Sequence, residues 1–171
     1  TCALPISTST VSGSHTACGG SYTETWSFTD ACGRTSTASR TITVSAAAQA
    51  TFASASDLTI ACTDAPPVPS SLAYSNGESG SCGISGTATS TVSGSHTACG
   101  GSYTETWSFT DACGRTSTAS RTITVSAAAQ ATFASASDLT IACTDAPPSA
   151  SSLSYSNGES GSCGISGTAT S

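Results

Sequence analysis

The stretch that decides the fold reads SYTETWSFTDACGRTSTASRTITV and runs from Ser102 to Val125. Large or apolar side chains alternate with small polar ones over its first nine residues, and alternation returns in its last eleven. Such alternation is typical of β-strands that bury one face. The sequence therefore predicts strands at 102–110 and 115–125, joined by a three-residue loop at 112–114.

The two strands are expected to pair as a hairpin in one register. Both buried faces meet the same core when Trp107 lies opposite Ala119, and this register leaves the three-residue loop. It also sets Glu105 opposite Arg121, which is favourable because an unpaired carboxylate on a core-facing position would be costly. Gly114 stands where the turn needs a left-handed residue. Asp111 opens the turn and is expected to bond its own backbone.

The chain repeats itself almost letter for letter. The 57 residues from Val11 to Pro67 recur unchanged from Val92 to Pro148, 81 positions later. A fixed period makes the repeat the structural unit. We therefore expect the chain to be a window of a longer tandem array. The structural residues of the hairpin form two equivalent sets, which are Glu24, Trp26, Asp30, Gly33 and Arg40, and Glu105, Trp107, Asp111, Gly114 and Arg121.

Further strands are predicted at 57–62, 71–75 and 86–92, and the glycine-rich stretch 93–101 is predicted to be a loop. Short strands without a helical pattern predict an all-β fold of tandem immunoglobulin-like β-sandwich modules. The connector at 126–132 is short and lacks glycine, so the modules are expected to stack end to end as a rod. The expected modules are the C-terminal part of one repeat at 1–45, a complete repeat at 51–126 and the N-terminal part of the next at 132–171.

The cysteines predict a disulfide framework in an oxidising, extracellular location. The chain has nine cysteines, and each repeat contains four. Four cysteines allow three pairings, and alternating strand directions within one sandwich favour Cys62–Cys99 and Cys82–Cys113. The repeat phase then pairs Cys2 with Cys32. Partners outside the window are expected for the remaining three, which are Cys18, Cys143 and Cys163.

The composition excludes several classes of partner. The chain has ten acidic residues and only four basic residues, counting Arg and Lys together, which gives a net charge of −6. So few cations argue against binding nucleic acid or anionic lipid. No apolar run is long enough to span a membrane.

No cofactor, metal ion or catalytic site is predicted. A zinc site would use His96 and Cys99 together with other cysteines, but the remaining cysteines lack Cys-x-x-Cys spacing. A calcium reading would use scattered acids without a D-x-D-x-D-G run, so calcium is disfavoured; these acids are Asp57, Asp64, Glu78 and Asp111. The G-x-S-x-G elbow of a serine hydrolase is also absent. We therefore expect a protein that is not an enzyme.

The hairpin resembles the end of hyalin-repeat-like (HYR-like) immunoglobulin modules, which are arrayed in large secreted surface proteins of Bacteroidota. The matching residues are Tyr103, Trp107, Asp111, Cys113, Gly114 and Ile123. Cys62 matches an upstream strand of those modules and Cys82 a middle segment, whereas Arg115 replaces the usual Asn. The resemblance implies the stalk of a cell-surface adhesin filament, as in the SprB-type adhesins that use type IX secretion and serve gliding motility.

The sequence therefore predicts a structural repeat segment at the cell surface. Its expected partners are neighbouring repeats, with lateral filament contacts or surface polysaccharide as further options. One alternative is a polysaccharide-binding module that uses a threonine face, which comprises Thr116, Thr118, Thr122 and Thr124. Another is a spacer of a secreted enzyme. Affinity of isolated repeats for glycans would distinguish the binding module from the inert stalk.

Overall fold

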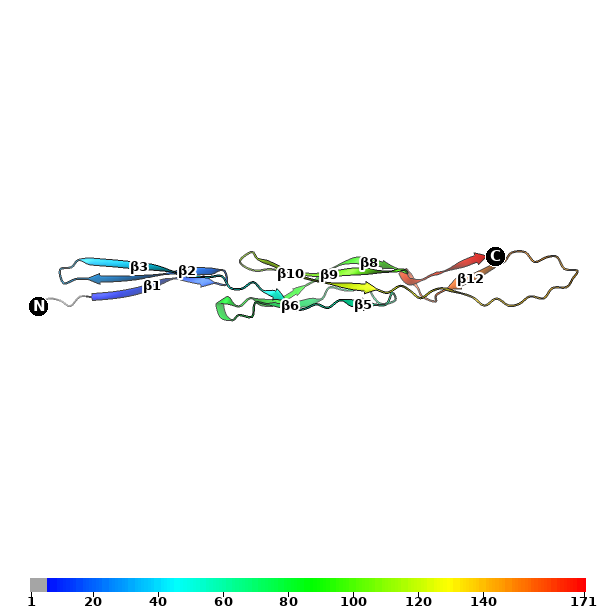
Figure 1. Ribbon diagram of the computed structural model, residues 1–171, viewed down its shortest axis with the longest axis horizontal. Helices are drawn as coiled ribbons and strands as arrows, with labels where there is room; N and C mark the ends of the chain where they lie inside the picture. The colour runs from blue at the N-terminus through cyan, green and yellow to red at the C-terminus, as the bar shows by residue number, and fades with distance from the viewer. Residues whose placement is uncertain (1–5) are drawn as a thin grey trace. The chain divides into compact units, whose positions relative to one another are not determined.

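The computed structural model describes residues 6–171, and the fold is all-β (Figure 1). Within this range the only helical segments are two single turns of 3-10 helix, η1 (Gly80–Cys82) and η2 (Gly161–Cys163). The strands are β1 (Ile6–Thr16), β2 (Gly19–Thr29), β3 (Thr35–Val44), β4 (Thr51–Phe52), β5 (Leu58–Ile60), β6 (Ser71–Ser75), β7 (Ser85–Thr89), β8 (Thr91–Thr97), β9 (Gly100–Thr110), β10 (Thr116–Val125), β11 (Thr132–Phe133), β12 (Ser152–Ser156) and β13 (Ser166–Thr170).

The first sheet has the order β1-β2-β3. In the β2–β3 hairpin, Glu24 lies opposite Arg40 and Trp26 lies opposite Ala38, which is the register that the alternation predicts. The turn closes through Gly33, whose φ of 80° lies in the left-handed region. Glycine adopts this conformation without the steric cost that a side chain would bring.

The second sheet has the order β5-β10-β9-β8 and contains an unexpected strand. The predicted loop at 93–101 is wrong except at residues 98–99, because β8 continues to Thr97 and pairs antiparallel with β9, which begins at Gly100. Glycine is common in loops, but in this sheet Gly94 allows the two strands to approach each other closely. A Cβ on Gly94 would collide with the carbonyl oxygen of Ser102 on β9. β5 runs parallel to β10, with Ile60 opposite Val125.

Two small sheets have the orders β4-β6-β7 and β11-β12-β13, and they share one register. Tyr74 lies opposite Gly86 in the first, and Tyr155 lies opposite Gly167 in the second. Each tyrosine ring covers the glycine opposite it so closely that a Cβ would collide with the phenol. The same local sequence therefore builds the same three-stranded element twice.

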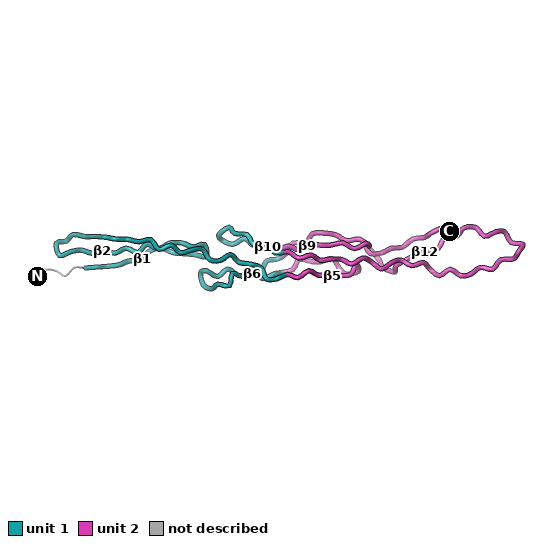
Figure 2. Tube along the Cα trace, in the orientation of Figure 1, with its two compact units in different colours: residues 1–54, 71–89, 107–119 teal, residues 55–70, 90–106, 120–171 magenta. Residues whose placement is uncertain are grey.

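The chain divides into two compact units, each made of three separate segments (Figure 2). Unit 1 comprises 1–54, 71–89 and 107–119, and unit 2 comprises 55–70, 90–106 and 120–171. In unit 1, the ring of Tyr74 on β6 stacks on that of Phe109 on β9, with ring centroids 3.8 Å apart. In unit 2, Cys62, Val125 and Cys163 form a buried cluster. The all-β class is confirmed, and the sheets are consistent with a β-sandwich, whereas the module boundaries stay a prediction.

Candidate functional site

Two disulfides are the most informative chemical feature of the structure. Cys18 is bonded to Cys113 within unit 1, and Cys62 is bonded to Cys163 within unit 2. The bonds join residues 95 and 101 positions apart. Both separations exceed the 81 positions after which the sequence repeats, so each bond joins one repeat to the next. The disulfides indicate a non-reducing environment.

The structure corrects the predicted pairing within a repeat. Cys62 and Cys113 are bonded to other partners, and Cys82 and Cys99 carry free thiols. The prediction assumed that strands alternate in direction within a closed sandwich. β5 instead runs parallel to β10, and the amide of Ser126 donates to the carbonyl of Ile60 at 2.9 Å. Cys62 therefore leaves the sheet beside the point where the chain enters the next repeat.

The remaining cysteines differ from expectation in two places. Cys18 and Cys163 were expected to have partners outside the window, but both are bonded inside it. Cys143 is free, as is Cys32. Cys2, the predicted partner of Cys32, lies outside the described residues.

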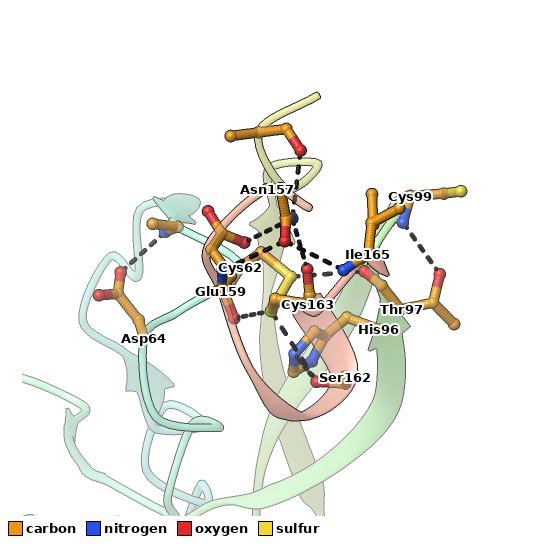
Figure 3. The surroundings of a disulfide bond; sticks show 12 residues. Cys62, Asp64, His96, Thr97, Cys99, Asn157, Glu159, Ser162, Cys163 and Ile165 are labelled. Atoms are coloured by element: carbon orange, nitrogen blue, oxygen red, sulfur yellow. Dashed lines mark hydrogen bonds between the residues drawn. A yellow bond between two sulfur atoms is a disulfide. The ribbon is translucent and has the colours of Figure 1, made fainter. Parts of the chain in front are cut away.

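Hydrogen bonds of a single asparagine hold η2 beside the Cys62–Cys163 bond (Figure 3). The side-chain amide of Asn157 donates to the carbonyl of Cys163 at 2.8 Å and to that of Ala129 at 3.2 Å. Its carbonyl oxygen accepts from the amides of Glu159 and Ile165. One asparagine therefore fixes both the turn that carries Cys163 and its connection to the preceding connector.

His96 lies on β8 beside the same bond, and not in the loop that the sequence predicts for it. Its Nδ1 lies 2.9 Å from the Tyr103 hydroxyl, and its Nε2 lies 3.0 Å from the Ser162 hydroxyl. The ligand atoms of Cys62, His96 and Cys163 lie within 4.8 Å of one another. Because the two sulfurs are bonded to each other, the imidazole is the only one of these ligands that the oxidised chain offers to a metal ion.

Asp111 organises the turn that carries Cys113. Its Oδ1 accepts from the amides of Cys113 and Arg115 at 2.9 Å, and its Oδ2 pairs with Arg115 Nε at 2.7 Å. Burial raises the pKa of Asp111, but the hydrogen bonds and charge of Arg115 and the Cys113 amide outweigh it, so the pKa lies below its ordinary value. Arg115 Nη1 also donates to the carbonyl of Ala47 at 2.6 Å. The Asp111 carboxylate therefore stabilises the turn that carries Cys113.

The other three acids considered as calcium ligands each accept a hydrogen bond from a different backbone amide. Asp57 accepts from Thr122 N, Asp64 from Ala61 N, and Glu78 from Ala48 N. Within residues 6–171, the one group of three potential metal ligands is the cysteine–histidine cluster described above. Sequence reasoning missed this cluster because Cys163 and His96 come together only through contact between repeats.

Glu105 is the central buried charge of unit 2, and its side chain is 0% exposed. Its Oε1 accepts from the Ser70 amide and from the hydroxyls of Ser70 and Ser90, at 3.0, 2.6 and 2.6 Å. Its Oε2 lies 2.7 Å from the Arg121 guanidinium. Burial raises the pKa of Glu105, but the serine hydrogen bonds and Arg121 outweigh it, so the net shift is downward.

The equivalent pair in the first hairpin has a different environment. Glu24 and Arg40 are also 2.7 Å apart, but their side chains are 18% and 62% exposed. Trp26 is 38% exposed, whereas Trp107 is 1% exposed. The two hairpins share their sequence, so the difference arises from what packs on them. This gives every substitution in the second hairpin a matched control in the first.

Comparisons with protein-family models, curated proteins and solved structures find no match for this chain. Within residues 6–171, no helix is long and apolar enough to cross a membrane. The groups that the fold brings together are two disulfides, acids that accept hydrogen bonds from backbone amides, and two ion pairs with buried carboxylates, Asp111–Arg115 and Glu105–Arg121.

Proposed function

We propose that the chain is a structural segment of a long extracellular adhesin filament at the cell surface, built from tandem immunoglobulin-like modules of 81 residues. The observation that carries this proposal is the pairing of cysteines from successive repeats. A bond within one repeat would protect that repeat alone. A bond between repeats adds a covalent cross-link across the junction, beside the backbone, and junctions bear the load in a stalk. Export by the type IX route and a part in gliding motility rest on the family resemblance.

The two bonds overlap along the sequence in a way that suits a load-bearing role. Cys62 lies between Cys18 and Cys113, and Cys113 lies between Cys62 and Cys163. Tension applied at the two ends passes through whichever bond gives the shorter covalent path. With the Cys62–Cys163 bond intact, the 101 positions between them cannot be extended. With only the Cys18–Cys113 bond, 95 positions remain protected.

Single-molecule stretching between the two termini should therefore depend on the redox state. Reduction is expected to lengthen the fully extended chain by roughly 330–360 Å, because the 101 residue spacings it releases span about 3.3–3.6 Å each. Cys18→Ser should leave the maximum length of the oxidised chain unchanged, since the second bond still limits extension. Cys163→Ser should add only about six spacings' length. Equal extension of the oxidised and reduced chains would contradict the proposal.

The cell-surface location has its own test. Antibodies raised against the oxidised chain are expected to label filaments outside intact source cells, as seen by immunogold electron microscopy. Fab fragments should reduce attachment of these cells to surfaces, because bound Fab covers the stalk. A non-binding Fab of the same class is the control. Labelling that requires permeabilised cells would overturn the location and the adhesin role together.

A glycan-binding module is the second candidate, and one observation favours it. An open groove contains Trp26 and Phe28 next to small hydroxyl side chains, including Ser9 and Thr37. Aromatic rings beside hydroxyls suit sugar recognition, yet the equivalent Trp107 is buried and Phe109 stacks on Tyr74. The exposed aromatic face is therefore better interpreted as a packing face without its cover. Glycan binding that is lost on Trp26→Ala would favour the module instead.

A further inference from the structure

One cluster of potential metal ligands lies within unit 2, where two repeats meet. It comprises Cys62, His96 and Cys163, whose ligand atoms lie within 4.8 Å of one another. Two sulfurs and an imidazole are the kinds of ligand that zinc prefers. We propose that, once a reductant opens the Cys62–Cys163 bond, these three side chains bind one zinc ion. This site goes beyond the role as a stalk, and its test does not depend on that role.

The fold brings three distant segments together at this point. Cys62 follows β5, His96 lies on β8, and Cys163 ends η2, which β8 contacts. Zinc holds its sulfur and nitrogen ligands about 2.0–2.3 Å from the ion. Ligand atoms that already lie within 4.8 Å of one another therefore need only small side-chain movements to surround one ion. A water molecule completes the four-coordinate shell, as it does in zinc sites with three protein ligands.

His96 is already oriented as a ligand. Its Nδ1 lies 2.9 Å from the hydroxyl of Tyr103, which is on the neighbouring strand β9. A histidine that binds a metal through one ring nitrogen usually donates the other N–H to an oxygen atom, which fixes the ring. Tyr103 supplies this oxygen, so Nε2 is the nitrogen left for the ion. Nε2 faces the hydroxyl of Ser162 at 3.0 Å (Figure 3), and Ser162 is exposed, so its hydroxyl can turn into solvent.

The surroundings of the two sulfurs favour a cation. Cys62 and Cys163 are 5% and 3% exposed, so thiolates at these positions would be shielded from water. A buried charge is costly without a partner. Unit 2 contains no Lys and one Arg, which is Arg121, and its guanidinium pairs with Glu105. A divalent metal ion supplies the missing positive charge, and it deprotonates the thiols that coordinate it.

The step that creates the site is a thiol–disulfide exchange with a dithiol. One thiolate of the dithiol attacks a protein sulfur, forms a mixed disulfide and releases the other cysteine as a thiolate. The second thiol of the reductant then closes a ring disulfide and releases the first cysteine. The protein disulfide gains two electrons from the dithiol, and two protons pass from the dithiol to Cys62 and Cys163. Zinc then displaces both protons and keeps its own oxidation state.

The zinc ion would keep the two repeats cross-linked after reduction. Cys62 and His96 belong to one repeat, and Cys163 belongs to the next. The disulfide and the zinc ion use the same two sulfurs, so they exclude each other. Either of them connects Cys62 to the following repeat. The junction therefore has one cross-link for oxidising conditions and another for reducing conditions.

Unit 1 contains a matched control for the histidine. His15 Nδ1 lies 2.8 Å from the Tyr22 hydroxyl, and His15 Nε2 lies 3.1 Å from the Ser81 hydroxyl. This is the arrangement of His96, 81 positions earlier in the sequence. The counterpart of Cys62 lies outside the sequence, so His15 belongs to an incomplete set of ligands. Substitutions at His15 and Tyr22 therefore change the same hydrogen bonds without removing a metal ligand.

The test uses the full chain with seven cysteines replaced by serine, so that no other thiol binds metal; these are Cys2, Cys18, Cys32, Cys82, Cys99, Cys113 and Cys143. This two-cysteine chain is reduced with dithiothreitol, which is then removed under nitrogen. One equivalent of Co²⁺ is expected to produce the near-ultraviolet absorption of cobalt–thiolate bonds and the visible bands of a four-coordinate ion. Zn²⁺ should abolish both, because zinc favours tetrahedral sulfur sites. The oxidised chain should show neither. A reduced, folded chain without these bands would overturn the proposal.

Paired substitutions in the two-cysteine chain test the imidazole. Tyr103→Phe should weaken Co²⁺ binding by about 10–100-fold, the usual effect of losing the outer partner of a ligand histidine. His96→Asn should weaken binding further, because a ligand itself is lost. His15→Asn and Tyr22→Phe should leave the affinity unchanged. Equal affinities for the His96→Asn and His15→Asn variants would overturn the assignment of His96 as a ligand.

Circular dichroism keeps the test decisive if the reduced chain unfolds. Metal binding and folding are coupled where the ligands come together only in the folded chain. If reduction removes the β-sheet signal of the two-cysteine chain, one equivalent of Zn²⁺ should restore it. The same addition should not restore the signal of the His96→Asn variant. A two-cysteine chain that stays unfolded with Zn²⁺ would overturn the proposal.

Discussion

Replacement of Glu105 with glutamine is expected to lower the free energy of unfolding by about 3 kcal/mol at pH 7, because it breaks a buried ion pair from one side. Glu105 is fully buried, and it accepts hydrogen bonds from Ser70 and Ser90 while it pairs with Arg121. The variant leaves the guanidinium without its charged partner. It also replaces an acceptor oxygen with an amide group that cannot accept the same hydrogen bonds.

The matched control is Glu24→Gln, which should cost below about 1 kcal/mol because exposed ion pairs contribute little. The measurement is urea denaturation of the oxidised chain at several pH values. The pKa of Glu105 is lowered in the fold. Its contribution to stability is therefore complete above the ordinary pKa of a glutamate and is lost as the pH falls through the lowered value. The gap between parent and Glu105→Gln should narrow in acid, and equal costs for the two variants would contradict this account.

Truncation of Trp107 to alanine should destabilise the chain by about 3–5 kcal/mol, the usual cost of removing a buried aromatic side chain from a core. Trp107 is 1% exposed and is the largest of the fully buried side chains within residues 6–171. Trp26 occupies the same place in an identical hairpin but is 38% exposed. Trp26→Ala should therefore cost distinctly less, about 1–2 kcal/mol, in line with ordinary substitutions.

The two tryptophans also provide the readout. The chain contains only these two, so each variant leaves one fluorescent reporter. The chain with Trp26→Ala should emit at shorter wavelength than the chain with Trp107→Ala, because its remaining indole is shielded from water. Denaturation followed by circular dichroism gives the two free energies on the same scale. If both variants had the same emission maximum and the same loss of stability, the difference in burial would be refuted.

The hairpins could be predicted from the sequence because their determinants are local. Alternation fixed which face is buried, and the length of the loop fixed that Glu24 lies opposite Arg40. Asp111 and Gly114 could be assigned to the turn from residue chemistry alone, and the backbone of Gly114 is left-handed, with φ 78°. β8 was missed because its glycine is a turn signal in sequence, although in the sheet it allows close packing.

The pairing of cysteines could not be predicted because it depends on contacts between repeats. The two hairpins have the same sequence, yet Cys113 is bonded and Cys32 is free. No local pattern distinguishes them. The parallel pairing of β5 with β10 was the missing information, since it directs Cys62 toward the following repeat. Once the disulfides are known, a bond between repeats is recognised because its two cysteines lie farther apart in sequence than one repeat of 81 residues.

The interleaved order of the four bonded cysteines has a consequence for survival outside the cell. A single protease cut anywhere between Cys18 and Cys113 leaves both pieces attached through the first disulfide. A cut between Cys62 and Cys163 leaves them attached through the second. Every peptide bond from Cys18 to Cys163 is therefore covered at least once, and those between Cys62 and Cys113 twice. A chain cut once by a protease within this range would therefore remain one covalent molecule.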